Sequence, residues 1–297
     1  MTAFWKAHRH QAQDGRRRPA RGVRPRRIVL MLVTGAIAVG ATGLALHLAE
    51  RRPGGAVAPP AGRINLINPG TLTVCTHLPY RPLEYEEGTT VVGFDIDLVH
   101  LLAKRLGLVD KYQQTEFRLI PSGYALNIGR CDLATSGLTI TPARQRVADY
   151  TAPYLIGGQA LLVRAGAPYD SLPSLAGKRI GVQNGTTGET YVLRHKPRGV
   201  EVISYDNLTA EEQGLTSRSI DAAVTDTPVC LDLAKRDPRF EVSARFNTGE
   251  RYGLAVKKNG NPLLLRSANQ WLAQIKRDGT WRRLYEKWFG AEPTTIP

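Results

Sequence analysis

Cysteine is scarce in this chain of 297 residues. The three cysteines, Cys75, Cys131 and Cys230, are an odd number, and no CxxC pair occurs. This usage argues against a zinc site and against a dense disulfide framework. Cys75 and Cys131 lie in apolar, strand-like runs, so we expect buried small apolar side chains. At most one disulfide can form, and the sequence does not indicate which pair would form it.

Motifs for catalysis and cofactor binding are also missing. The sequence contains no HExxH motif, and no Ser-His-Asp arrangement or pair of catalytic carboxylates is evident. The turn Gly185-Thr186-Thr187 lacks the Gly-x-x-x-x-Gly-Lys-Ser/Thr pattern of a phosphate-binding loop. We therefore expect no metal, no cofactor and no enzymatic activity.

Acidic residues are nearly absent from the first 52 residues. This stretch holds 11 of the 40 Lys and Arg residues but only 2 of the 26 Asp and Glu residues, so it carries +9 of the net charge of +14. The rest of the chain is mildly basic and does not interleave basic with aromatic residues. The pattern therefore argues against nucleic acid as a partner.

An apolar run follows the basic arm. Residues 28–49 contain no Asp, Glu, Lys or Arg, and this length matches the ~20 residues that span a bilayer as a helix. We expect residues 1–27 to form a cytoplasmic arm, 28–49 a transmembrane helix or signal anchor, and 50–62 a linker rich in Pro, Gly and Ala. The remaining chain then lies on the extracytoplasmic side of the cell membrane. A cleaved signal peptide is the alternative, with Ala56-Val57-Ala58 as the nearest cleavage pattern.

From residue 63 onward, strand-like and helix-like patterns alternate. Such alternation is typical of parallel sheets covered by helices, so we expect an α/β fold. The expected strands span residues 71–76, 131–134, 159–163, 178–182, 201–204, 222–225 and 252–256, and the expected helices span 95–106, about 123–129, 262–277 and 280–289.

One strand-to-helix junction carries the residues of a ligand site. After the apolar strand come small and hydroxyl residues and then a helix start, namely Ser136, Gly137, Thr139, Thr141 as N-cap, Pro142 and Arg144. Open α/β sheets bind ligands where strands end and helices begin. A guanidinium forks onto a carboxylate, and hydroxyls and carbonyls accept hydrogen bonds from an ammonium. The junction therefore suits a small zwitterion.

Eight short segments, in order along the globular region, carry a family pattern. They are Tyr80-Arg81-Pro82-Leu83-Glu84-Tyr85, Val92-Gly93-Phe94-Asp95-Ile96-Asp97-Leu98, the segment from Ser136 to Arg144, Gly158-Gln159-Ala160-Leu161-Leu162-Val163, Gly181-Val182-Gln183-Asn184-Gly185-Thr186-Thr187, Asp221-Ala222-Ala223-Val224-Thr225-Asp226, Tyr252-Gly253-Leu254-Ala255-Val256 and Ile275-Lys276-Arg277-Asp278-Gly279-Thr280-Trp281. With them, residues from about 71 to 290 closely resemble the family 3 extracytoplasmic solute-binding proteins, which deliver amino acids to ABC importers.

The resemblance implies a two-lobed periplasmic-binding-protein fold of type II, with two crossing strands as a hinge and the ligand in the cleft. The first lobe would be discontinuous, from residues 63–158 and 252–297, and the second would span 163–247. The crossing strands would lie near residues 159–163 and 248–252.

The resemblance also implies the roles of the polar site residues. Arg144 matches the arginine that takes the α-carboxylate of the ligand, and Asp226 matches the carboxylate that pairs with the α-ammonium. Thr187 opens a second-lobe helix whose N-terminus would receive the same carboxylate. Further polar contacts would come from Ser136, from the carbonyl of Gly137 and from Thr139.

The side chain of the ligand would lie between two aromatic residues, which Tyr80 and Phe94 match. Members that bind cationic amino acids carry an acidic residue just before the first aromatic, where this chain has His77. Without that carboxylate, a basic side chain would be desolvated unpaired. We therefore expect a polar or acidic amino acid as the ligand and an ABC permease as the partner.

Two other functions stay open at this point. A membrane anchor with a binding domain outside also fits a ligand-sensing receptor subunit. Some proteins of this fold are cyclohexadienyl dehydratase-like enzymes, for which Glu84, His77 or Glu189 would have to serve as the acid.

Overall fold

The computed structural model describes residues 63–297. The expected cytoplasmic arm, transmembrane helix and linker fall on residues 1–62 and lie outside the described residues. Within 63–297, no helix combines the length and the apolar character needed to cross a bilayer.

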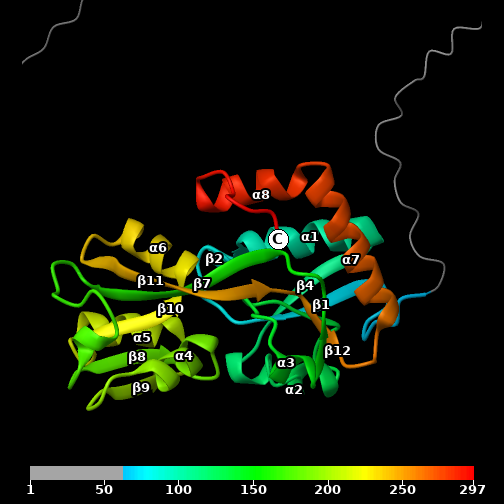
Figure 1. Cartoon of the computed structure of the whole chain (residues 1–297). Coiled ribbons are helices and arrows are strands. Elements are labelled where there is room, and N and C mark those ends of the chain that lie inside the picture. The colour runs from blue at the N-terminus through cyan, green and yellow to red at the C-terminus, as the bar shows by residue number, and fades with distance from the viewer. Residues whose placement is uncertain (1–62) are drawn as a thin grey trace, which may run out of the picture. The chain divides into compact units, whose positions relative to one another are not determined.

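The first sheet has the strand order β4-β1-β5-β12-β6 and is called lobe 1 together with its helices (Figure 1). β1 is parallel to β4 and β5, whereas β12 is antiparallel to β5 and β6, so the sheet is mixed rather than purely parallel. The strands are β1 Thr71–Thr76, β4 Val109–Gln114, β5 Leu133–Ala134, β6 Ala148–Tyr150 and β12 Ala255–Lys257. A small hairpin, β2 Tyr85–Glu87 and β3 Thr90–Val92, follows β1.

Helices cover both faces of this sheet. Alternate residues of β1 face opposite sides, so Leu72 and Val74 join one core and Cys75 joins another. α1, α7 and α8 lie over the first core, and α2 and α3 lie on the other side (Figure 1). These elements are α1 Phe94–Leu106, the 3₁₀ helix η1 Phe117–Leu119, α2 Tyr124–Asn127, α3 Pro142–Gln145, α7 Pro262–Arg277 and α8 Thr280–Phe289.

The second sheet has the order β11-β7-β10-β8-β9 and is called lobe 2 together with its helices. α4 packs on one face through Val192, and α5 and α6 pack on the other through Leu215 and Leu233. The elements are β7 Leu155–Arg164, the 3₁₀ helix η2 Pro173–Leu175, β8 Arg179–Gln183, α4 Thr187–His195, β9 Glu201–Tyr205, α5 Leu208–Thr216, β10 Ala222–Asp226, α6 Thr227–Arg236 and β11 Phe240–Tyr252.

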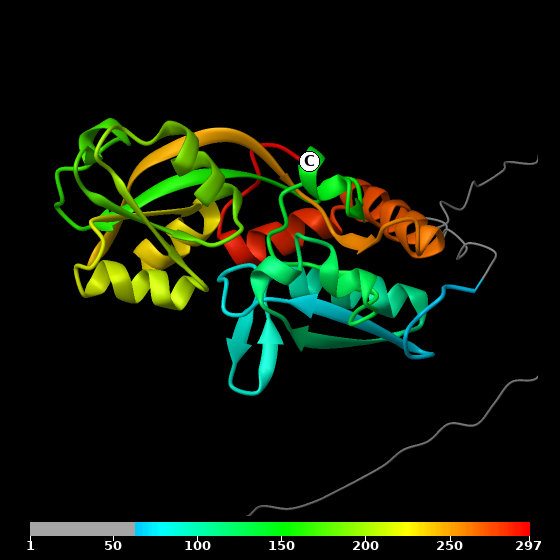
Figure 2. The same cartoon turned by 90° about the horizontal axis from the view of Figure 1, so that it is seen from below.

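Two long strands connect the lobes. β7 and β11 pair antiparallel from Tyr252 opposite Leu155 to Phe240 opposite Arg164, with register shifts on the way. Figure 2 shows them running side by side between the two lobes. Because the connection consists of two strands, a change in their backbone torsions can move one lobe against the other.

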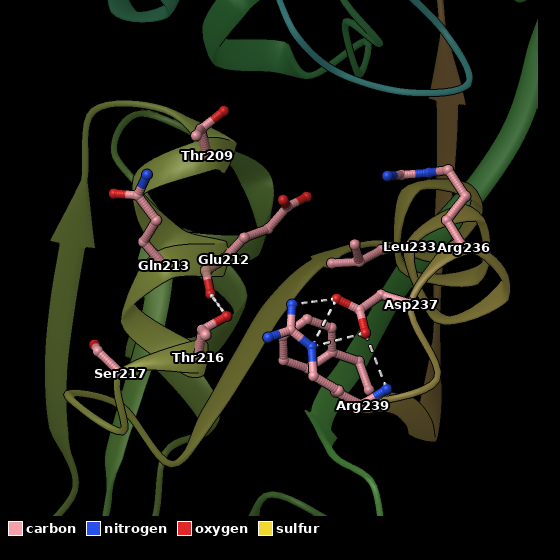
Figure 3. A pocket seen from close by; sticks show the side chains of 10 residues that line it. Thr209, Glu212, Gln213, Thr216, Ser217, Leu233, Arg236, Asp237 and Arg239 are labelled. Carbon is pink, nitrogen blue, oxygen red and sulfur yellow. Dashed lines mark hydrogen bonds and ion pairs between the residues drawn. The ribbon is translucent and has the colours of Figure 1, made fainter.

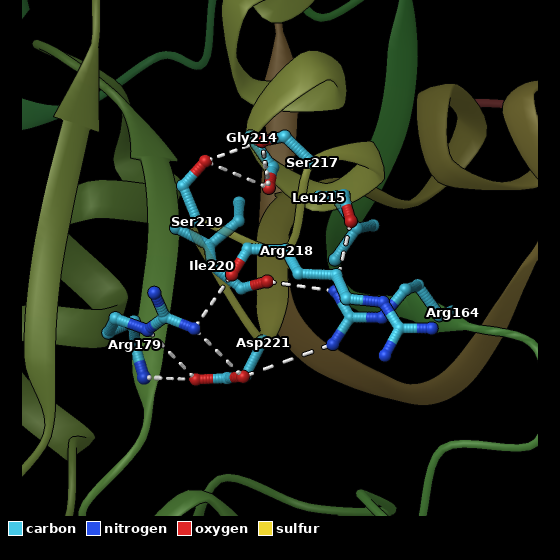
Figure 4. Close-up of polar contacts among 9 residues, drawn as sticks. All are labelled: Arg164, Arg179, Gly214, Leu215, Ser217, Arg218, Ser219, Ile220 and Asp221. Atoms are coloured by element: carbon cyan, nitrogen blue, oxygen red, sulfur yellow. Dashed lines mark hydrogen bonds and ion pairs between the residues drawn. The ribbon is translucent and has the colours of Figure 1, made fainter.

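The end of lobe 2 where β8 and β10 begin is held by charged side chains (Figure 4). Asp221 accepts from the Arg179 amide at 2.9 Å and from its guanidinium at 3.3 Å. Arg164 donates to the carbonyls of Leu215 and Ile220, at 2.9 Å each. These contacts fix the end of the sheet opposite Gln183 and Asp226, where β8 and β10 terminate.

Two sequence expectations need correction. Cys75 and Cys131, expected as free apolar side chains, are both buried but joined as a disulfide, and Cys230 is a buried free thiol. The strand expected at 252–256 is divided, because β11 ends at Tyr252 and β12 begins at Ala255. Gly253 lies between them, where an added Cβ would lie 2.8 Å from the Ile140 side chain.

Candidate functional site

The predicted site residues lie where the strands of both lobes end. The segments after β1 and β5 supply the lobe 1 residues, apart from Phe94 at the start of α1, and the ends of β8 and β10 supply those of lobe 2. A cavity of about 1000 Å³ opens between them; its lining includes Thr139, Arg144, Gly185, Thr187 and Glu250. Hydrogen bonds cross from one lobe to the other beside this cavity, so the lobes are close together in this structure.

Arg144 is placed by a short capped helix. The Thr141 side chain accepts from the Arg144 amide at 3.2 Å, and Pro142 occupies the first turn of α3, as the sequence predicts. The guanidinium donates to the carbonyl of Thr139 at 3.0 Å and, across the cleft, to that of Gly185 at 3.2 Å.

The Arg144 guanidinium has no acidic partner. It is 8% exposed and is the only buried Lys or Arg in the described part of the chain, and no described carboxylate lies within 4 Å of it. Burial lowers its pKa from the usual value. The two contacts to carbonyls leave further N–H groups of the fork for an anion in the cleft.

Asp226 lies on the opposite lobe as the last residue of β10. It is 6% exposed and accepts from Gln159 Nε2 at 2.6 Å. Burial raises the pKa of Asp226 to about 7, and the nearby Glu250 adds to the shift. An added Cβ at Gly137 would lie 3.5 Å from Asp226 Oδ2. This carboxylate therefore directly faces the segment between β5 and α3, residues 135–141, which is called the lobe 1 loop.

Two buried carboxyl groups of lobe 1, those of Glu84 and Asp95, hold the lobe 1 loop in place through hydrogen bonds. Ser136 Oγ donates to Glu84 Oε1 at 2.7 Å, and the Gly137 amide donates to Asp95 Oδ2 at 3.1 Å. Thr135 and Tyr154 also donate to Asp95. Burial raises the pKa of both Glu84 and Asp95, and each is close enough to affect the other. Their role here is to position the loop, a role that the sequence motifs alone do not reveal.

Thr139 and Thr187 meet at a carboxylate from the hinge. Their hydroxyls donate to Glu250 Oε2 at 2.7 and 3.0 Å, and they lie 3.3 Å from each other across the cleft. Gln159 of β7 donates to Glu250 Oε1 at 2.9 Å. Thr187 is the first residue of α4, which Thr186 caps. Glu250 and Gln159 were not among the predicted site residues, although both lie in the predicted crossing strands.

The aromatic residues are arranged differently from the expectation. Tyr80 is 7% exposed, and its hydroxyl lies 3.1 Å from Thr225 Oγ1 of lobe 2. Phe94 lies in the core of lobe 1, with its ring 5.2 Å from Phe289. Phe117 of η1 lies at the cleft instead, with the Arg144 guanidinium 6.0 Å from its ring centre.

His77 lies at a second, smaller opening of the cleft. It lines a cavity of about 220 Å³ together with Glu116, Phe117, Arg118, Asn184, Asp206 and Asn207. His77 Nδ1 lies 2.9 Å from the Thr115 carbonyl, and Nε2 has no partner among the described residues. Burial lowers the pKa of His77.

Another cavity, of about 690 Å³, lies in lobe 2 and contains none of the predicted site residues (Figure 3). It is lined by α5, α6 and the start of β11, and its Arg239 pairs with Asp237 at 2.6 Å. Within residues 63–297, no group of His, Cys, Asp and Glu side chains is arranged to hold a metal ion.

Comparisons with known proteins agree with this geometry. A family model described as bacterial extracellular solute-binding proteins, family 3, matches residues 72–291. The L-cystine-binding protein TcyJ of Escherichia coli (strain K12) is 32% identical over 229 residues, which are 76% of this chain and 85% of that protein.

Two solved structures are similar in fold as well as in sequence. An ancestral arginine-binding protein bound to arginine is 39% identical with a TM-score of 0.70, over 74% of this chain and 99% of that one. The ancestral amino acid-binding protein AncCDT-1, a precursor of cyclohexadienyl dehydratase, is 38% identical with a TM-score of 0.68, over 74% and 96%.

Proposed function

Because the chain belongs to family 3 of the bacterial extracellular solute-binding proteins, we propose that it captures one amino acid between its lobes and delivers it to an ABC importer. The observation that carries this proposal is the placement of two buried, opposite charges on different lobes. Arg144 belongs to lobe 1 and Asp226 to lobe 2, and neither is in an ion pair with the other. A free amino acid supplies the two complementary charges.

The proposed pose follows from the donors and acceptors. The α-carboxylate lies against the Arg144 guanidinium and the N-terminus of α4 at Thr187, because the first amides of a helix bind anions. The α-ammonium donates to Asp226, with Ser136, Gly137 and Thr139 of the lobe 1 loop around it. Tyr80 and Phe117 enclose the side chain, so Phe117 replaces Phe94 in this proposal.

The same contacts explain why the ligand would close the molecule. Contacts to Arg144 and to Asp226 can be made together only when the lobes are close. A ligand that binds the closed form better than the open form shifts the population toward it. The hinge strands β7 and β11 permit the movement, and the permease would then recognise the closed, loaded form.

The N-terminal part of the proposal rests on sequence alone. We propose that residues 28–49 tether the binding domain to the cell membrane and place it on the extracytoplasmic side. N-terminal sequencing of the mature protein tests this point. A mature chain that begins after residue 49 would contradict the tether and would fit a cleaved signal peptide.

Calorimetric titration of the full chain with each of the twenty amino acids tests the binding function. We expect heat of binding from at least one of them and a matching rise in melting temperature. A chain that is folded and binds none of the twenty would contradict the proposal. Turnover of prephenate or arogenate by the same preparation would instead support the dehydratase alternative, to which the similarity with AncCDT-1 gives some weight.

A further inference from the structure

Buried acidic side chains outnumber buried basic ones near the boundary between the lobes. Five carboxyl side chains are buried in the cleft or in the layers behind it, whereas Arg144 is the only buried Lys or Arg in residues 63–297; the five are Glu84, Asp95, Glu211, Asp226 and Glu250. Four of the five accept hydrogen bonds from neighbouring groups. Glu211 is the exception.

Glu211 is a buried carboxyl group without a partner. It belongs to α5, is 1% exposed, and neither of its oxygens has a hydrogen bond in the described part of the chain. Its stem packs on Gly181 of β8, where an added Cβ would lie 3.4 Å from Glu211 Cγ. Side chains of a helix point toward its N-terminus. The N-terminus of α5 is at Asn207, which lines the small cavity beside His77. Besides burial, Glu211 also raises the pKa of Tyr80, and Asp226 raises that of Glu211, so the carboxyl group lies near two residues at the boundary between the lobes.

A second unpartnered group lies on the same face of the sheet. Gln183 follows Gly181 by two residues on β8, so both face α5. Gln183 is 1% exposed, and its Nε2 has no hydrogen-bond partner among the described residues. Thr225 of β10 meets the Tyr80 hydroxyl close by. The unsatisfied groups thus lie beyond the aromatic residue that would cover the ligand side chain.

We propose that Glu211, assisted by Gln183, is the specificity-determining residue that receives the ammonium or guanidinium end of a cationic amino acid. This inference rests on the proposed amino-acid-binding function. A buried, unpaired carboxylate is costly, and a cation at that place removes the cost while an acidic side chain would increase it. The acid that the sequence lacks at His77 is then supplied by a different element, and the expected preference for a polar or acidic ligand is reversed.

The protonation of Glu211 is consistent with such a role. Burial raises its pKa to about 8, with Glu212 and Asp226 adding to the shift. The other titratable groups that it faces are Tyr205 of β9, Cys230 of α6 and Tyr80 of lobe 1. This shift favours the protonated form of the group in the ligand-free protein at neutral pH. A cation bound beside it favours the ionised form, so binding releases this proton to the buffer.

The test is calorimetric titration of the full chain with L-arginine, L-lysine and L-ornithine, each compared with L-citrulline, the uncharged isostere of arginine. We expect arginine to bind roughly 10- to 100-fold more tightly than citrulline, the range of a hydrogen bond to a charged group. Repeating the titration in buffers of different ionisation enthalpy should show proton release with arginine.

The Glu211→Gln variant should lose most of the preference for arginine over citrulline and part of the proton release, while citrulline binding stays within a fewfold of the parent. Glu212→Gln is the matched control, since Glu212 is the next residue of α5 but lines the separate cavity of Figure 3. Gln183→Lys is a second variant that places a cation beside Glu211 from β8. It should weaken arginine binding and favour uncharged or acidic ligands.

The outcomes separate the two proposals. An unchanged arginine-to-citrulline ratio in both Glu211→Gln and Gln183→Lys would overturn this inference and leave amino-acid binding intact. A parent chain that prefers glutamate or aspartate would overturn it as well. A folded chain that binds no amino acid would overturn the proposed function, and this inference with it.

Discussion

At the level of single residues, the two lobes face each other with side chains of opposite kinds. Arg144 lines the main cavity from lobe 1, and Asp226 of lobe 2 faces the loop after β5. Both residues stand in recognisable sequence motifs. Glu211 stands in no motif, and Gln183 lies in a family segment without being assigned a role there, because what distinguishes both is the lack of a partner in three dimensions. The difference between Phe94 and Phe117 is likewise not visible in the sequence, since an aromatic residue beside a turn looks alike whether it faces the core or a cavity.

Removing the Arg144 guanidinium tests the carboxylate half of the site. We expect Arg144→Ala to weaken binding of the preferred amino acid by about 3 to 5 kcal/mol, more than a hundredfold, because the ligand carboxylate would be buried without its partner. Arg239→Ala is the control, since Arg239 pairs with Asp237 at the surface of lobe 2. Equal affinities of the parent and Arg144→Ala, measured by calorimetry, would remove Arg144 from the site.

The two phenylalanines should differ in their effect on affinity. Phe117→Ala should reduce affinity as well as stability, because Phe117 is a buried core residue that also lies beside the Arg144 guanidinium. Phe94→Ala should lower the free energy of unfolding by about 3 to 5 kcal/mol, as removal of a fully buried ring does. Denaturant unfolding and calorimetry of both variants separate the effects. If Phe94→Ala loses affinity while keeping its stability, the original assignment of Phe94 is restored.

At the level of elements, the predicted bounds agree with the observed ones where the sequence carries strong capping and turn residues. The last two helices were predicted with their bounds, because Asn261 caps α7 with Pro262 at its start, and Gly279 and Gly290 flank α8 with positive φ values. β4 and β6 were missed, because their half-buried residues lack a continuous apolar run. β5 is shorter than the expected strand, since it begins at Leu133 rather than at Cys131.

The disulfide ties this part of lobe 1 to its central strand. Cys75 belongs to β1, and Cys131 precedes β5, so the bond closes a loop over 56 positions of the chain. A loop of this length predicts a stabilisation of about 4 kcal/mol by the chain-entropy relation. We therefore expect the double variant Cys75→Ser/Cys131→Ser, or reduction of the parent, to lower the free energy of unfolding by roughly this amount in denaturant titrations.

The control for this prediction is Cys230→Ser. Cys230 is a buried thiol outside the disulfide, so the Cys230→Ser variant keeps the bond. Reductant should therefore lower the free energy of unfolding of this variant by the same amount as that of the parent. A parent chain with the same denaturation midpoint in oxidising and reducing buffer would show that the bond contributes nothing to stability.

At the level of the whole molecule, the order of elements predicts the architecture, while the relation between the lobes emerges only in three dimensions. The two-lobed fold is borne out by similar solved structures. Three of the bonds at the boundary between the lobes meet at Glu250, which accepts from Thr139 of lobe 1, Thr187 of lobe 2 and Gln159 of the hinge. No local pattern identifies such a residue, since these partners come from three separate segments of the chain.

The buried carboxyl groups also predict how stability depends on pH. Folding raises the pKa of Asp226 to about 7 and that of Glu211 to about 8, so between pH 5 and pH 7 the folded state binds protons that the unfolded state has lost. The free energy of unfolding therefore falls as the pH rises. Each group lowers it by about 1.4 kcal/mol for every pH unit of rise in this interval.

Denaturant unfolding of the ligand-free parent and Glu211→Gln, measured from pH 5 to pH 8, isolates the contribution of one group. The variant cannot ionise, so we expect its advantage over the parent to grow as the pH rises and to level off near pH 8. Glu201→Gln, at an exposed position of the same lobe, should show no such growth. Saturating cationic ligand should reduce the difference, because it supplies the ionised Glu211 with the partner that the empty cleft lacks. A difference between parent and variant that is constant over the whole pH range would mean that Glu211 ionises as freely in the folded chain as in the unfolded one.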